Sequence, residues 1–129
     1  MIAIPIDSQG INIKSSALFG NVDMFALYKE SEKSFTFMKN DASGNGIKTA
    51  KFLKQNGVTK TVYSYMGDGP FKELNANGVE VFYIGKEPMG LSEIVNNIKE
   101  KKFIQVNTSN ASTYLDPGTA TENCNCGCS

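Results

Sequence analysis

The alternation of apolar and polar positions predicts a chain that begins with three strands. Residues 1–6 are nearly all apolar, which is typical of a central strand covered on both faces. Residues 24–28 and 34–38 are rich in apolar and aromatic side chains, and a polar turn joins them. We therefore expect an antiparallel hairpin here, with Phe35 and Phe37 on one face.

Apolar residues recur at helical spacing in three later segments, which alternate with strands predicted at 58–65 and 79–84. The second helix should begin with Asp68 or Gly69 as its cap and Pro70 as its first residue. The inward-facing residues are predicted to be Ile47, Ala50 and Leu53 in the first helix, Phe71 and Leu74 in the second, and Leu91, Ile94, Val95 and Ile98 in the third.

This order of elements predicts an α/β fold built on a five-stranded mixed sheet. Strand-helix-strand units are parallel and right-handed, so helices should cover the faces of the sheet. Ligands of such sheets bind at the carboxyl ends of the parallel strands, where the connections diverge. Three glycine-bearing loops, at 7–23, 40–46 and 66–70, should meet there. Two of them precede helices, whose backbone N–H groups favour anions.

The length of 129 residues fits one folded domain, which we place at residues 1–106. Residues 107–129 are mostly Asn, Ser, Thr, Gly and Ala, and we expect them to form a flexible polar tail. All three cysteines of the chain, Cys124, Cys126 and Cys128, lie in this tail.

Two missing residue types exclude several kinds of function. The chain has no His, which rules out Ser-His-Asp triads, Cys-His pairs and histidine metal sites. All 13 basic residues are Lys, so no Arg offers a bidentate contact to phosphate. A net charge of zero also argues against nucleic acid as a partner, because nucleic-acid binding depends on a positive excess.

The chain carries no targeting feature that we recognise. Its first residues lack the basic region of a signal peptide, and no apolar run approaches the roughly 18 residues of a membrane span. Three clustered cysteines also differ from the even, dispersed set typical of small secreted domains. We therefore expect a cytoplasmic protein with no membrane partner.

The array Cys124-x-Cys126-x-Cys128 is the first candidate site. Dense thiolates bind soft ions such as Cu(I) or Zn, or an iron-sulfur fragment. Three thiolates leave one position of a tetrahedral site open, and an incomplete site suits transfer of a metal better than storage. A redox role for the thiols and a tail without any role are the alternatives.

Asp7 and Asp68 are the second candidate pair, because each should follow one of two neighbouring parallel strands. Two carboxylates in this arrangement can hold Mg²⁺, as a metal-dependent nuclease or phosphotransferase requires. The alternative is structural: Asp68 caps a helix and Asp7 forms a turn.

Several short motifs share their order and spacing with one known family. They are Ile2-Ala-Ile-Pro-Ile-Asp7, Ser16-Ala-Leu-Phe-Gly20, Gly44-Asn-Gly-Ile-Lys-Thr-Ala50 and Met66-Gly-Asp-Gly-Pro70. Through these motifs the chain resembles the dinitrogenase iron-molybdenum cofactor biosynthesis family of NifX-like nitrogenase accessory proteins, and the resemblance extends over about residues 1–98.

This resemblance implies a three-layer ribonuclease-H-like fold and a non-catalytic carrier or chaperone of metal-sulfur clusters. The cargo would be an iron-sulfur cluster or an iron-molybdenum cofactor precursor, exchanged with cluster donor and acceptor proteins. The residues that the resemblance assigns to the cluster groove are Ser16, Phe19, Gly20, Gly44, Asn45, Gly46, Met66, Gly67, Asp68 and Gly69.

One position departs from the family pattern. Many of its members have His directly before the Phe-Gly pair, whereas this chain has Leu18 there. A regulatory domain that keeps the fold without binding a cluster is therefore a further alternative.

Overall fold

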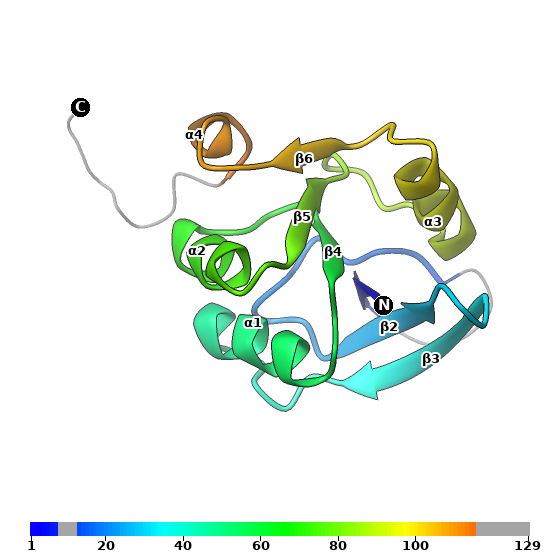
Figure 1. Cartoon of the computed structure of the whole chain (residues 1–129). Coiled ribbons are helices and arrows are strands. Elements are labelled where there is room, and N and C mark those ends of the chain that lie inside the picture. Colours follow the sequence, from blue (N-terminus) through cyan, green and yellow to red (C-terminus); the bar gives the residue numbers. More distant parts are fainter. Residues whose placement is uncertain (8–12, 116–129) are drawn as a thin grey trace.

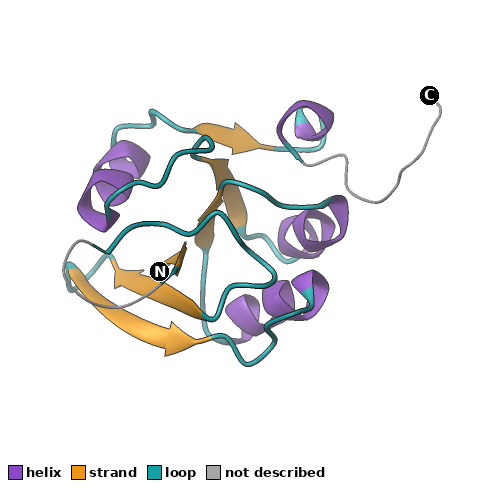
Figure 2. Cartoon of the chain, turned by 180° about the vertical axis from the view of Figure 1, so that it is seen from behind, coloured by secondary structure: helices purple, strands orange, loops and turns teal. Residues whose placement is uncertain are grey.

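The computed structural model of this chain describes residues 1–7 and 13–115. Its centre is a six-stranded mixed sheet with helices on both faces (Figures 1 and 2). The strands are Ile2–Ile6 (β1), Met24–Lys29 (β2), Ser34–Lys39 (β3), Lys60–Tyr63 (β4), Glu80–Tyr83 (β5) and Ile104–Val106 (β6). The helices are Gly46–Gln55 (α1), Asp68–Ala76 (α2), Leu91–Lys99 (α3) and Ala111–Tyr114 (α4).

The sheet has the strand order β3-β2-β1-β4-β5-β6, which places β1 inside it. β1 is antiparallel to β2 and parallel to β4, and β4 is in turn parallel to β5. The predicted hairpin is confirmed as β2 and β3, in which Ala26 lies opposite Phe37. Every residue of β1 is buried, as its apolar sequence predicts for a strand with both faces covered.

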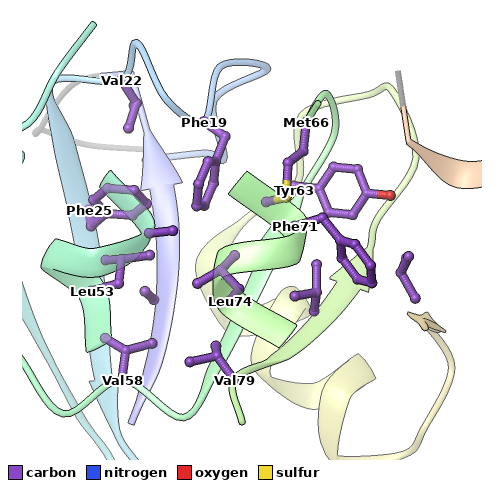
Figure 3. Close-up of a cluster of buried hydrophobic side chains, with 14 of the residues drawn as sticks. Phe19, Val22, Phe25, Leu53, Val58, Tyr63, Met66, Phe71, Leu74 and Val79 are labelled. Atoms are coloured by element: carbon purple, nitrogen blue, oxygen red, sulfur yellow. The ribbon is translucent and has the colours of Figure 1, made fainter. Parts of the chain in front are cut away.

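Two apolar clusters form the layers on either side of the sheet. Ala3 of β1 lies in the cluster beneath α1 and α2, whereas Ile4 lies in the cluster beneath α3. Figure 1 shows α1 and α2 on one side of the sheet and α3 on the other. Figure 3 shows the α1 and α2 side, where Leu53 and Leu74 point toward the strands. Successive side chains of β1 point to opposite faces of the sheet, so this one strand contributes residues to both clusters.

The sheet has one strand more than the five that we predicted. β6 pairs antiparallel with β5, and Val106 lies opposite Val81. After β6 the folded part continues through α4, where the Tyr63 hydroxyl donates a hydrogen bond to the Tyr114 carbonyl. The tyrosine rings at 83 and 114 pack against each other with centroids 5.5 Å apart. A three-residue strand followed by a polar segment is too short to show a period of two in the sequence.

Some residues differ from their predicted places. Ile47 of α1 is 45% exposed, whereas Thr49 is buried. The Thr49 hydroxyl can be buried because the Gly20 and Ala42 carbonyls accept hydrogen bonds from it. Phe37 is also exposed, since it lies on the outermost strand. Helix α2 begins earlier than predicted: Gly67 is its cap, so Pro70 is the third helical residue, where its missing N–H costs no helical bond.

α1 is the longest of these helices, with ten residues. In the described part of the chain, no helix has the length and apolar character required to cross a membrane.

Replacing Lys101 with glycine is expected to stabilise the protein. Lys101 follows α3 with φ 58°, and the backbone N–H of Lys102 reaches back to the Asn97 carbonyl at 2.9 Å, as in a Schellman motif. The left-handed conformation strains a residue with a Cβ, so Lys101→Gly should raise the free energy of unfolding by about 0.5–1 kcal/mol in urea. The control Lys99→Gly, within the helix, should lower it by about the same amount. A lower urea midpoint of unfolding for Lys101→Gly than for the parent would contradict this prediction.

Candidate functional site

A groove of about 870 Å³ lies where the chain leaves the carboxyl ends of β1 and β4. Figure 3 shows two of its residues, Phe19 and Met66, near the carboxyl end of β1 at the top of the apolar cluster. The chain after β1 returns through β2, whereas the chain after β4 continues through α2 to β5. The groove therefore lies at the point where neighbouring connections diverge to opposite sides, which is the usual ligand position in such sheets. The lining residues are Ala17, Leu18, Phe19, Gly20, Asn21, Gly44, Gly46, Tyr65, Met66, Gly67 and Pro70.

Hydrogen bonds attach the loop after β1 to the loop before α1. The backbone N–H of Gly44 donates to the Gly20 carbonyl at 2.9 Å, and the Thr49 hydroxyl donates to the same carbonyl at 3.3 Å. Asn40 is buried, and its amide donates to the Val22 carbonyl at 2.9 Å. These bonds satisfy polar groups that would otherwise be buried without partners, so they fix one wall of the groove.

The three loops approach one another so closely that only glycine fits between them. A Cβ placed on Gly20 would lie 2.7 Å from the Cα of Gly46, which is backbone and has little room to move. A Cβ placed on Gly46 would in turn overlap the ring of Pro70 at the start of α2. The Gly20–Gly46–Pro70 contact thus joins all three loops at the groove.

Six of the ten residues that the resemblance assigns to the groove line it in the structure, namely Phe19, Gly20, Gly44, Gly46, Met66 and Gly67. Phe19 and Met66 are buried with 3% exposure each, so they form its floor. Phe19 packs edge-on against Phe25, with ring centroids 5.8 Å apart. This contact continues the groove floor into the core.

The other four assigned residues support the loops and do not line the groove. The buried Ser16 hydroxyl accepts a hydrogen bond from the Leu18 N–H at 3.0 Å. The Asn45 side chain caps α1 by accepting from the Lys48 N–H at 2.9 Å. Asp68 forms an exposed ion pair with Lys72 at 2.9 Å, and Gly69 lies against the side chain of Ile47.

Five lining residues were not predicted: Ala17, Leu18, Asn21, Tyr65 and Pro70. Leu18 and Tyr65 are 49% and 40% exposed, which is high for large apolar or aromatic side chains. Leu18 and Tyr65 directly precede Phe19 and Met66 in the sequence. This adjacency could have indicated that they line the groove, because residues next to a predicted loop motif share its surroundings.

Among the residues that the structure describes, no charged side chain lines the groove, but two features beside it favour anions. The amino end of α2 at Gly67 has no side-chain cap, so its first N–H groups face this region, and the Asp68 carboxylate in the first turn lies at the same end of the helix dipole. The Lys86 ammonium lies 3.9 Å from the centre of the Tyr65 ring. The electrostatic environment beside the groove therefore includes the backbone groups of α2, the Asp68–Lys72 ion pair and the Lys86 ammonium.

Among residues 1–7 and 13–115, no group of three or more His, Cys, Asp or Glu side chains is arranged to hold a metal ion. Asp7 is exposed after β1, and Asp68 is paired with Lys72. The predicted thiolate ligands, Cys124, Cys126 and Cys128, lie outside the described residues. The soft donor atom that the described residues bring to the groove is the Met66 thioether.

Residues 1–101 match the protein family described as dinitrogenase iron-molybdenum cofactor. No individually curated protein matches the chain. The apo form of the orange protein from Desulfovibrio gigas is similar in structure, with a TM-score of 0.73 and 21% identity over 81% of this chain and 91% of that one. A Thermotoga protein of the DUF35 family, provisionally named NifB, has a TM-score of 0.69 and 24% identity over 83% and 93%. At these identities the two structures establish a shared fold.

Proposed function

The chain belongs to the dinitrogenase iron-molybdenum cofactor family, and we propose that it binds and carries a metal-sulfur cluster as cargo, without catalysing a reaction on it. The cargo would be an iron-sulfur cluster or an iron-molybdenum cofactor precursor. The observation that carries this proposal is the groove where β1 and β4 end, walled by glycine-bearing loops. We place the role in the cytoplasm, with cluster donor and acceptor proteins as partners.

The size of the groove favours a cluster over a single ion. A volume of about 870 Å³ is in the range of pockets for small molecules, far above what one metal ion occupies. Four of its lining residues are glycines, at positions 20, 44, 46 and 67. A Cβ on Gly44 or Gly67 would meet no atom within 4 Å, so a compact cluster can approach the backbone closely at these two positions, whereas Gly20 and Gly46 serve the contact between the loops.

The chemistry of the walls also fits sulfur-rich cargo. Sulfide atoms of clusters accept hydrogen bonds, and hydrogen bonds to the sulfurs and solvent exposure are among the means by which a protein tunes a cluster. The uncapped amino end of α2 offers backbone donors, and the buried Met66 offers a polarisable surface. Leu18 and Tyr65 add apolar surface at the groove, where it would limit access of water.

We propose that Cys124, Cys126 and Cys128 supply the covalent ligands that the groove lacks. The described chain ends at Leu115, next to Tyr114, whose carbonyl accepts the hydrogen bond of Tyr63 at the end of β4. Eight residues separate Leu115 from Cys124, so the nine Cα–Cα steps between them allow a span of at most ~30 Å. Because Tyr65 of the groove is only two residues after Tyr63, we propose that this span is long enough for the thiol to reach the groove.

Anaerobic reconstitution tests the proposal. The full chain is incubated with iron, sulfide and molybdate, passed through gel filtration, and analysed for metal and sulfide-to-metal absorption. We expect the full chain to retain a cluster, and a chain that ends at Asn123 or carries three Cys→Ser substitutions to retain markedly less. A full chain without bound metal would overturn the proposed function. Equal retention after truncation would overturn the role of the cysteines and assign binding to the groove alone.

A further inference from the structure

We propose that Lys86 makes this groove selective for sulfur-rich anions, so that its ligand class is an anionic cluster or thiometallate and not a free metal cation. This inference rests on the proposed function. It assigns a specificity-determining role to a residue outside the groove lining.

The Tyr65 ring lies between Lys86 and the groove. It follows Gly85, whose φ of 88° turns the chain after β5. The Lys86 Nζ atom lies 3.9 Å from the Tyr65 ring centre and 5.9 Å from that of Tyr83. Tyr65 lines the groove, so the ring that carries the ammonium is also part of the groove wall.

The charge of Lys86 is not neutralised by a carboxylate. Of the ion pairs in the described part of the chain, none includes Lys86, although the exposed Glu87 follows it in sequence. Asp68, the acidic residue at the start of α2, is paired with Lys72 instead. An aromatic ring attracts an ammonium through its quadrupole and leaves the net charge of the ammonium intact. The positive charge beside the groove therefore remains available to an anion.

The side chain of lysine suits this role. Its ammonium is a point charge on a flexible four-carbon stem, so it can move from the Tyr65 ring toward an anion without a change in the backbone. Together with the backbone N–H groups at the amino end of α2, where the Asp68 carboxylate is paired with Lys72, it places positive charge beside a groove that no charged side chain of the described residues lines. A soft cation would find the Met66 thioether as a single soft donor in the groove and would depend on the thiolates for its other ligands, so the groove and the cysteines would recognise different forms of metal.

The test uses the full chain and the thiomolybdate dianion, titrated without oxygen at low and at high salt. Lys86→Gln should weaken binding about three- to tenfold at low salt and reduce the dependence of the dissociation constant on salt. Lys86→Arg should bind as the parent does. The matched control is Lys99→Gln, because Lys99 also lies over a tyrosine ring, that of Tyr28, but on α3. This control should leave binding unchanged.

Three outcomes would overturn the inference. Equal affinity and equal salt dependence for Lys86→Gln and the parent would remove the role of Lys86 and leave the proposed function intact. A loss of thiomolybdate affinity in Lys99→Gln equal to that in Lys86→Gln would show that net charge, and not the position of Lys86, determines binding. A parent chain that retains an iron-sulfur cluster in the reconstitution but does not bind thiomolybdate would show that the groove does not select sulfur-rich anions.

Discussion

Gly20→Ala is expected to lower the free energy of unfolding by about 1–3 kcal/mol, the usual cost of forcing an extra methyl group into a packed site. The new Cβ would lie 2.7 Å from the Cα of Gly46, and backbone atoms at this position cannot move without shifting α1. Relief of this overlap would also disturb the hydrogen bond between the Gly44 N–H and the Gly20 carbonyl. Urea unfolding followed by far-ultraviolet circular dichroism measures the loss.

The control for this substitution is Gly67→Ala in the same groove. A Cβ at Gly67 meets no atom within 4 Å, and φ is −82°, which any residue adopts. Alanine is a poorer helix cap than glycine, but it restricts the unfolded chain, and the two effects nearly offset. Gly67→Ala should therefore unfold at nearly the parent's urea concentration. If Gly20→Ala were as stable as this control, the Gly20–Gly46–Pro70 contact would be looser than the structure shows.

Gly67→Phe is expected to abolish binding of cargo in the groove while the protein stays folded. Gly67 lines the groove and has free space where a side chain would project, so a phenyl ring there occupies volume that a cluster needs. We expect at least about a tenfold loss of affinity for thiomolybdate, equivalent to ~1.4 kcal/mol. The loss of cap quality should cost only about 1 kcal/mol of stability.

Gly67→Ser provides the matched comparison for this blocking substitution. Serine is small and is a preferred helix cap, so it should leave the groove open and slightly raise stability. It should also bind thiomolybdate within about twofold of the parent, because only a hydroxymethyl group is added. Undiminished binding by Gly67→Phe, with unchanged circular dichroism, would show that the cargo binds elsewhere.

The sequence predicted the parts of the fold that depend on apolar periodicity. A fully apolar first strand, a hairpin and two strand-helix-strand units imply where parallel strands end, and the loops with Gly20, Gly46 and Gly67 do meet there. Periodicity could not show that Thr49 replaces Ile47 in the core, because hydrogen bonds from distant loops stabilise the buried hydroxyl. It also missed β6 and α4, whose three and four residues are too few to show a period.

The individual residues of the groove were harder to predict than its position. Leu18 and Tyr65 are large and apolar or aromatic, so a pattern of buried positions assigns them to the core, whereas both are substantially exposed at the groove. Ser16 and Asn45 belong to the predicted motifs, yet their side chains bond to neighbouring backbone groups. A motif thus locates a loop, but the direction of each side chain depends on contacts between loops.

The hydrogen bond from Tyr63 to Tyr114 determines where the last described residue, Leu115, is anchored. If Cys124 acts at the groove as we propose, this anchor acts as a tether point, and the eight intervening residues limit the volume in which the thiol can be found. Confinement within ~30 Å corresponds to an effective concentration on the order of millimolar. The groove would then bind its thiolate ligand intramolecularly. A free thiol in solution would occupy the same position to the same extent only at a similar concentration, on the order of millimolar.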